Sequence, residues 1–112
     1  MSTLFSPLKL RELTIPNRAW MAPMCQYQAD PTGPQAGVVN DWHLGHLVAR
    51  AAGGLGLILL EATAVAPEGR ITPGCLGLWN ETQARALTRV TRFLEEHDVV
   101  PAIQLAHSGR KG

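Results

Sequence analysis

Two nearly continuous apolar runs, each preceded by an amphipathic helix pattern, constrain the fold of this 112-residue chain more than any other feature. The runs are "GLILLEATAV" (56–65) and "VVPAIQLAH" (99–107), and both are typical of parallel strands that are covered on both faces. A third apolar run, "RAWMAPM" (18–24), ends near Pro23, whose missing N–H group suits a strand end. We therefore expect three buried parallel strands.

Helix patterns fill the two gaps between these strands. Asn40 or Asp41 can cap the first helix, Gly53 and Gly54 end it, and Asn80 can cap the second. The apolar residues that share one face of the first helix are Leu44, Leu47, Val48 and Ala51. Those of the second helix are Leu87, Val90, Phe93 and Leu94. Because crossovers between parallel strands are right-handed, both helices should cover the same face of the sheet.

Alternation of buried strands with amphipathic helices indicates an α/β fold with a parallel sheet. The sequence has no glycine-rich phosphate-binding motif, which argues against an open nucleotide-binding sheet. The long loop 26–40 and the polar residues at the strand ends favour a (β/α)8 barrel, preceded by a short hairpin over 8–15 with Arg11 and Glu12 at its turn. Such a barrel takes about 250 residues. We therefore expect residues 1–112 to be the N-terminal portion of a single barrel domain in a larger protein.

Charge and cysteine content exclude several classes of function. The net charge of +1 leaves no electrostatic footprint for nucleic acid, and no run approaches the roughly 20 apolar residues of a membrane span. The first ten residues lack the charged-then-apolar form of a secretory signal. Cys25 and Cys75 match no metal or redox spacing, so we expect two free thiols in a cytoplasmic protein.

Functional groups of a parallel barrel sit at the carboxyl ends of its strands. These ends carry Pro23–Cys25 with Tyr27 just beyond, Glu61–Thr63, and Gln104 with His107 beyond. Their spacing makes neither a nucleophile–base pair nor a metal-ligand set. From the stretch "PMCQY" alone, a buried cysteine and a surface tyrosine is the simpler interpretation. The alternative is a thiol and a phenol that face one site.

Other polar residues have structural interpretations. His43 and His46 lie on one helix face with no third metal ligand, so we expect hydrogen-bonded structural histidines. Glu61 lies in a buried strand and needs a partner, for which we expect an ion pair. Arg110 and Lys111 are either solvated or close to a bound cofactor.

Four separated segments together resemble the old yellow enzyme family of flavin-dependent ene-reductases. The segments are "LFSPLKLRELTIPNRAWMAPMCQY", "NDWHLGHL", "EATAVAPEGRI" and "IQLAHSGRKG", which follow the family's order and intervals. The resemblance runs over essentially the whole chain. The cysteine of "PMCQY" resembles the thermophilic-like bacterial subgroup, because classical members tend to carry threonine there.

The resemblance implies a (β/α)8 barrel with FMN at the carboxyl ends of the strands. The residues that it implies for the flavin are Ala22, Pro23, Met24, Cys25, Ala62 and Gln104. The backbone of Ala62 and the amide of Gln104 would bond the pyrimidine edge of the flavin, and a glutamine amide offers both the donor and the acceptor that this edge needs. Tyr27 would lie on the substrate side. The alternatives are packing for Met24 and Ala62, and a hydrogen bond inside the barrel for Gln104.

The activity that the resemblance implies is reduction of activated C=C bonds, such as those of enones, with NAD(P)H as hydride donor. The family's substrate-polarising His pair (or His and Asn), its proton-donating tyrosine and its phosphate loop would lie beyond residue 112. No catalytic residue is therefore assigned, and this segment alone is expected to be inactive. The implied partners are an α,β-unsaturated small molecule, the remainder of the barrel and further copies of the protein. A larger iron–sulfur flavoenzyme of the dienoyl-CoA reductase kind and a non-catalytic α/β binding module are the alternatives.

Overall fold

The computed structural model describes residues 3–111, which form a two-stranded sheet, a four-stranded sheet and two α-helices. In chain order these elements are β1 Leu8–Leu10, β2 Leu13–Ile15, β3 Trp20–Met21, α1 Asp41–Ala51, β4 Leu57–Ala64, β5 Leu76–Gly77, α2 Glu81–Glu96 and β6 Val100–Ala106. Single turns of 3-10 helix cover Thr3–Phe5, Pro67–Gly69 and Gly109–Lys111.

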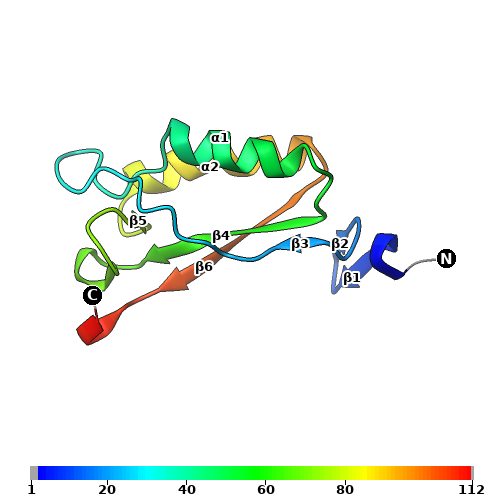
Figure 1. The fold of residues 1–112 in the computed structure, drawn as a ribbon, viewed down its shortest axis with the longest axis horizontal. Coiled ribbons are helices and arrows are strands. Elements are labelled where there is room, and N and C mark those ends of the chain that lie inside the picture. The colour runs from blue at the N-terminus through cyan, green and yellow to red at the C-terminus, as the bar shows by residue number, and fades with distance from the viewer. Residues whose placement is uncertain (1–2, 112) are drawn as a thin grey trace.

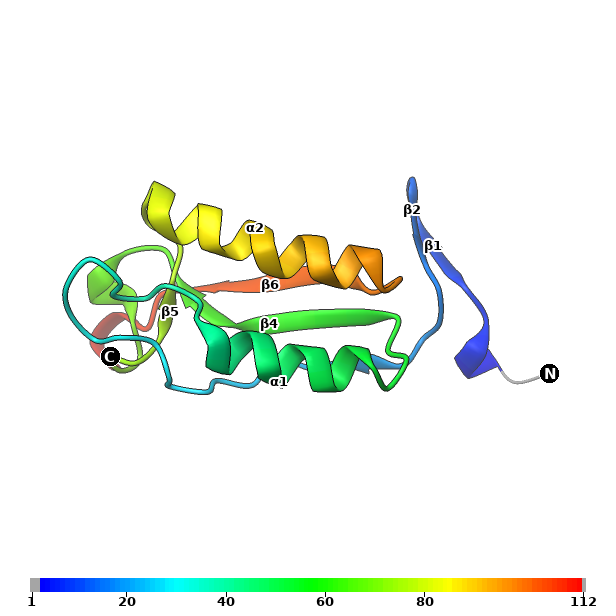
Figure 2. The same ribbon diagram turned by 90° about the horizontal axis from the view of Figure 1, so that it is seen from above.

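The four-stranded sheet is parallel, with β4 at its centre. β6 pairs with β4 along its whole length, while the other edge of β4 pairs first with β3 and then with β5. α1 and α2 lie side by side over one face of this sheet (Figures 1 and 2). The parallel sheet and the placement of both helices on one face confirm the expectation from the strand–helix alternation.

Two strands of the sheet, β3 and β5, differ from the sequence prediction. The strand expected over 18–24 is a ladder of only two residues, Trp20 and Met21, and the chain then continues without strand pairing through Pro23. Pro23 has no N–H group to donate to a ladder. The short β5 was not predicted, and it takes the edge of β4 at Thr63 and Ala64.

Both helices begin where the sequence predicts. Asn40 is the N-cap of α1 and Asn80 that of α2, and each closes a capping box in which its side chain and that of the third helical residue exchange hydrogen bonds with the backbone. The third residue is His43 in α1 and Gln83 in α2. α1 ends before Gly53 and Gly54, as expected.

The core lies between the helices and the sheet. Leu47 and Ala51 of α1 meet the buried residues of α2 over Ile58 and Leu60 of β4. The buried residues of α2 are Gln83, Leu87, Val90 and Leu94, which contain most of the predicted apolar stripe. Phe93 is partly buried against the same cluster.

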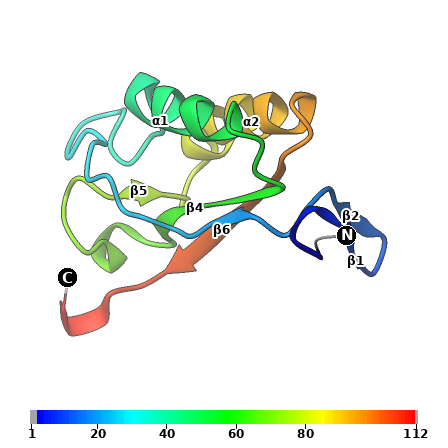
Figure 3. The ribbon, with the colours of Figure 1, turned by 45° about the vertical axis from the view of Figure 1, so that its right-hand side comes forward.

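The hairpin predicted over 8–15 is present as β1 and β2. Its register runs from Leu8 opposite Ile15 to Leu10 opposite Leu13, and Arg11 has a positive φ of 55° at the turn. Figure 3 shows the hairpin beyond the amino ends of the parallel strands. It is therefore distant from the carboxyl ends, where the sequence places its candidate site.

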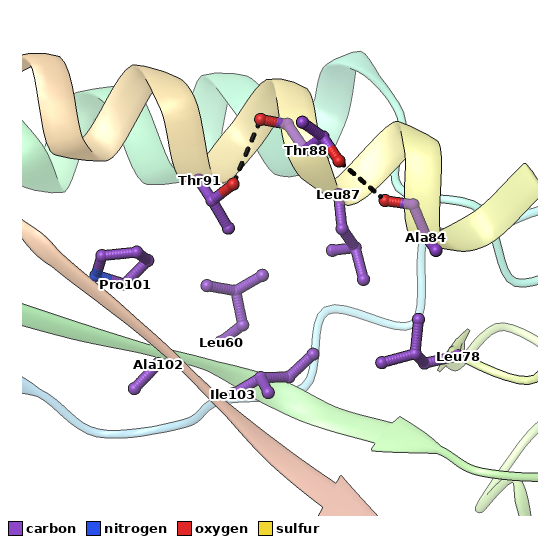
Figure 4. A pocket seen from close by; sticks show the side chains of 9 residues that line it. All are labelled: Leu60, Leu78, Ala84, Leu87, Thr88, Thr91, Pro101, Ala102 and Ile103. Carbon is purple, nitrogen blue, oxygen red and sulfur yellow. Dashed lines mark hydrogen bonds between the residues drawn. The ribbon is translucent and has the colours of Figure 1, made fainter. Parts of the chain in front are cut away.

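An apolar groove runs between α2 and the strands β4 and β6 (Figure 4). Its volume is about 310 Å³, and Leu60, Leu87 and Ile103 are among its lining residues. Thr88 and Thr91 also line it, but their hydroxyl groups donate to the helix carbonyls of Ala84 and Thr88, respectively. Both hydroxyl groups thus have hydrogen-bond partners within α2, so the surface of the groove is mainly apolar.

Candidate functional site

The candidate site lies at the carboxyl ends of the parallel strands. The loop after β3, the loop after β4 and the end of β6 gather at this one end of the molecule, on the left in Figure 1. Because the sheet is parallel, residues from distant parts of the sequence meet here. The positions singled out in the sequence on β4 and β6, and on the segment after β3, all lie at this end.

Ala62 of β4 and Gln104 of β6 are register partners. An irregularity between Leu60 and Ala62 leaves Glu61 outside the ladder and brings these two residues opposite each other. Ile103 packs toward the helices, so alternation along the strand directs Gln104 to the opposite, uncovered face. Gln104 is exposed, and its amide has no hydrogen-bond partner within residues 3–111.

The segment after β3 has a left-handed backbone conformation at Tyr27, whose φ is 55°. Two hydrogen bonds hold this turn: Gln26 N–H donates to Glu61 Oε1 at 3.5 Å, and Gln26 Nε2 donates to the carbonyl of Met24 at 3.1 Å. Met24 is 50% exposed and Tyr27 47% exposed. Cys25 is half-buried between them. We call residues 25–27 the Cys25–Tyr27 turn.

Gly74 supports this turn from the loop before β5. A Cβ atom at Gly74 would come within 2.7 Å of the Tyr27 carbonyl oxygen and 3.0 Å of its carbonyl carbon. Ala29 N–H donates to the Gly74 carbonyl at 3.0 Å, which joins the two loops. This role of Gly74 was not predicted from the sequence, where the only indication of it is the Pro73–Gly74 pair in a loop.

The thiol of Cys25 and the phenol of Tyr27 interact. Electrostatic repulsion from Cys25 is the main cause that raises the pKa of the Tyr27 phenol above its ordinary value, ahead of burial and of a side-chain hydrogen bond with Cys25. The two side chains therefore interact, while a shared site for them stays a prediction.

Glu61 has no ion-pair partner within residues 3–111, so the expected ion pair is absent from this part of the chain. The side chain is 7% exposed, and Arg89–Asp41 is the only ion pair among the described side chains. Burial raises the pKa of the Glu61 carboxyl to about 7, against a smaller lowering by the Gln26 N–H. Sequence reasoning placed the carboxyl correctly in a buried strand but could not foresee that a backbone N–H would be its partner.

The structure supports the expected structural role for one of the two histidines of α1. His43 Nδ1 accepts the N–H of Asn40 at 3.0 Å in the capping box, which confirms the structural role. Nevertheless, the Nε2 atoms of His43 and His46 are both buried and have no partner in the described chain. Burial, and then His46, lower the pKa of His43 to about 4. No group of three potential ligands suited to a metal occurs among residues that the structure describes.

The remaining candidates lie apart from this cluster. Cys75 is buried and free, and its sulfur accepts the N–H of Thr72 at 3.4 Å. The His107 ring packs close to Gly69, and Arg110 is exposed. The Lys111 side chain is outside the described set. In the described residues no helix is long and apolar enough to cross a membrane.

Comparison with known proteins assigns the family. The family model of the NADH:flavin oxidoreductase / NADH oxidase family matches residues 3–112. The chain belongs to this family. An NADPH dehydrogenase of Listeria monocytogenes is 50% identical over 111 residues, which are 99% of this chain and 32% of that protein. This chain therefore spans about a third of the length of the curated relatives that it matches.

Solved structures of family members have the same fold. The old yellow enzyme from Trypanosoma cruzi matches with a TM-score of 0.86 and 30% identity over 98% of this chain and 28% of that one. Morphinone reductase in complex with tetrahydroNAD matches with a TM-score of 0.83 and 28% identity, over all of this chain and 29% of that one. The old yellow enzyme resemblance and the barrel fold, of which this chain supplies a part, are thus both confirmed.

Proposed function

We propose that this chain is the N-terminal portion of an FMN-binding barrel domain whose complete protein uses NAD(P)H to reduce the activated C=C bonds of enone-type substrates. Three findings support the proposal. The family is one of flavin oxidoreductases, the similar bacterial proteins are NADPH dehydrogenases, and one structural relative is a reductase in complex with a nicotinamide analogue.

The pairing of Ala62 with Gln104 carries the proposal. The pair presents a small residue and an unpartnered amide on the face of the sheet that the helices leave open. The edge of a flavin pyrimidine ring alternates hydrogen-bond donors and acceptors, and the amide of Gln104 can supply both. A backbone group at Ala62 can approach such a ring closely because the side chain is a single methyl group. The residues present therefore fit FMN.

The segment after β3 would complete this side of the site. Ala22, Pro23, Met24 and Cys25 would line the flavin, and Tyr27 would bind an oxygen of the substrate through its phenol. The Gln26 N–H bond to Glu61 and the close approach of Gly74 hold this segment against β4. When bound, FMN supplies the hydride chemistry. The task of these residues is to orient the ring, shape the pocket and place the substrate.

The remainder of the barrel would supply the groups that polarise the substrate and hold the flavin phosphate, so residues 1–112 alone are proposed to be inactive. We further propose that the complete protein is cytoplasmic and forms homo-oligomers, as the sequence analysis expects.

The test uses the full-length protein, purified and examined for bound flavin. The proposal predicts FMN as the bound flavin, anaerobic bleaching of its spectrum by NADPH or NADH, and recovery of the spectrum when an enone is added. A protein without flavin, or a reduced flavin that an enone does not reoxidise, would overturn it. Iron and acid-labile sulfide in the same sample would favour the iron–sulfur flavoenzyme instead.

A further inference from the structure

A small cavity with a mostly apolar lining lies between α1 and β4, and Met24, the residue before the Cys25–Tyr27 turn, is part of its wall. Its polar lining residues are His43 and His46 of α1 and Glu61 of β4, and apolar side chains that include Met24 and Leu60 close the rest. About 10 Å³ of its space is open to the centre of a water molecule, which is room for one such molecule. The two histidines whose Nε2 atoms have no partner in the described chain and the buried Glu61 thus line a space of the size of one water.

The capping box fixes the tautomer of His43. Because His43 Nδ1 accepts the N–H of Asn40, this nitrogen carries no proton, and the neutral ring must carry its proton on Nε2. His43 is 1% exposed. The Nε2–H group is thus a buried donor without an acceptor, an arrangement that costs free energy unless a partner is present.

Glu61, which lines the same cavity from β4, offers the missing acceptor. One of its oxygen atoms, Oε1, already accepts the N–H of Gln26, in the middle of the Cys25–Tyr27 turn. A water molecule in the cavity can accept from His43 Nε2–H and donate to Glu61 and to His46 Nε2. This would give the water three partners, the usual number for a buried water.

We propose that one buried water links His43 Nε2–H to the Glu61 carboxyl and to His46 Nε2, so that Asn40, His43, Glu61 and Gln26 form one continuous hydrogen-bonded relay. The relay makes Glu61 and His43 positioning residues for the Cys25–Tyr27 turn. It connects the start of α1 to the turn, alongside the bond from Asn40 Nδ2 to the Gln28 carbonyl at 2.9 Å. Any effect of the relay on catalysis rests on the proposed function, whereas the hydrogen bonds of the relay do not depend on that function.

Ionisation of Glu61 should change the strength of the hydrogen bonds along the whole relay. A carboxylate accepts a stronger hydrogen bond from Gln26 N–H than a neutral acid does. The titratable groups that line the cavity are Glu61 from β4 and the two histidines from α1. Arg50 of α1 acts on His46 electrostatically, while Cys25 and Tyr27 lie on the turn itself. His43 stays neutral well below pH 7 because of its burial, so Glu61 is the group that titrates near neutral pH.

Nuclear magnetic resonance of the full-length protein, with ¹⁵N-labelled histidine and backbone amides and with flavin removed, tests the relay. We expect His43 protonated on Nε2 and His46 protonated on Nδ1, with a slowly exchanging His43 Nε2–H. The Gln26 amide and the His43 Nε2–H should shift together in one titration with a midpoint at about pH 7. A His46 ring protonated on Nε2, a rapidly exchanging His43 Nε2–H, or a His43 signal indifferent to the Gln26 titration would overturn the proposal.

Glu61→Gln provides the second arm, with Glu68→Gln in the exposed loop after β4 as the matched control. The relay predicts that Glu61→Gln abolishes both titrations and that Glu68→Gln leaves both unchanged. In the flavin-loaded enzyme, Glu61→Gln should also remove an inflection near neutral pH from the rate of reoxidation by an enone. If both NMR titrations persist in Glu61→Gln, the relay is refuted. An intact relay in a protein that does not reduce enones would refute only the proposed function.

Discussion

The backbone conformation of Tyr27 could not be predicted from the residues around it in the sequence. Its φ of 55° is uncommon for a large aromatic residue, and the structure supports it through Gly74 and through the Gln26–Glu61 bond. Sequence reasoning placed Cys25 and Tyr27 at a strand end, but it had no information on which remote residues hold the turn. Those residues lie 35 and 47 positions further along the chain, so local pattern analysis could not pair them.

Replacing Tyr27 by Phe should separate the two half-reactions of the full-length enzyme. The ring and the turn remain, but the phenol can no longer donate to an oxygen of the substrate. We expect reoxidation by an enone to slow by about 2- to 10-fold, as for a lost hydrogen bond of about 0.5–1.5 kcal/mol. Flavin reduction by NADPH should be nearly unchanged. Stopped-flow measurement of each half-reaction provides the comparison, and equal effects on both would place Tyr27 outside the substrate site.

Replacing Cys25 by Ala should leave an active, flavin-bound enzyme with a shifted reduction potential. A half-buried thiol is a weak donor and a polarisable neighbour of a ring, so its loss should change the relative stability of the oxidised and reduced flavin. Reductive titration against a reference dye measures the potential, with Cys75→Ala as the control thiol. Complete loss of alkene reduction with FMN still bound would point to a covalent or proton-transfer role instead.

At the scale of elements, regular patterns were predictable and irregular ones were not. α1 and α2 follow from apolar periodicity and asparagine caps, because a capped amphipathic segment satisfies both its backbone and its core. β4 and β6 follow from their nearly continuous apolar runs. β3 is shorter than its apolar run, since pairing depends on a neighbour and on N–H groups that Pro23 lacks. β5 has two residues and is defined only by its contact with β4, so its own sequence carries no periodic signal.

Replacing Gly74 by Ala should disturb the Cys25–Tyr27 turn although it replaces none of the proposed flavin residues. The added methyl group would meet the Tyr27 carbonyl at 2.7 Å, and overpacking of this kind typically costs about 1–3 kcal/mol. Gly45→Ala is the control, because nothing lies within 4 Å of a Cβ there. Urea unfolding and the enone half-reaction of the full-length protein should both worsen for the first variant only. Equal behaviour of the two variants would contradict the role assigned to Gly74.

The buried carboxyl and the buried imidazole should have opposite effects on the pH dependence of stability. The pKa of Glu61 is raised from 4.5 to about 7, so the folded state binds the extra proton and stability falls as pH rises through this window. The pKa of His43 is lowered from 6.5 to about 4, so stability falls as pH drops through that window. Glu61→Gln should therefore stabilise the full-length protein more at about pH 8 than at about pH 5. Urea unfolding at both pH values measures this, and a larger gain at the lower pH would contradict the assignment.

Within residues 3–111, helices cover the four-stranded sheet on one face only. Both helices lie over one side, while the opposite side of β6 and the groove beside α2 remain open (Figures 1 and 4). The order of elements predicted a parallel α/β sheet, and the long loop 26–40, the polar residues at the strand ends and the family resemblance predicted part of a barrel, which the solved relatives confirm. The surfaces that the rest of a barrel would cover could be located only from the structure, since they depend on how far each side chain is left exposed.

Residues 1–112 expressed alone should not unfold cooperatively. Leu105, at the end of β6, is 58% exposed, and β6 has an unpaired edge that would template association. We expect aggregation or a broad, non-cooperative loss of circular dichroism in denaturant, in contrast to the full-length protein. A sharp unfolding transition of a soluble monomer would show that this part is stable without the remainder of the barrel.

The FMN affinity of a variant without the Gln104 amide tests whether the Ala62–Gln104 pair binds the flavin as proposed. Gln104→Leu in the full-length protein should leave polar atoms of the flavin without a partner, which costs about 1–3 kcal/mol, or about 5- to 150-fold in Kd. Gln35→Leu, the same change at an exposed glutamine in the loop before α1, is the control. Fluorescence titration of each flavin-free variant with FMN gives the affinities. We expect weaker binding for Gln104→Leu alone, and an FMN affinity equal to that of the unmodified protein would refute the proposed contact between Gln104 and the flavin.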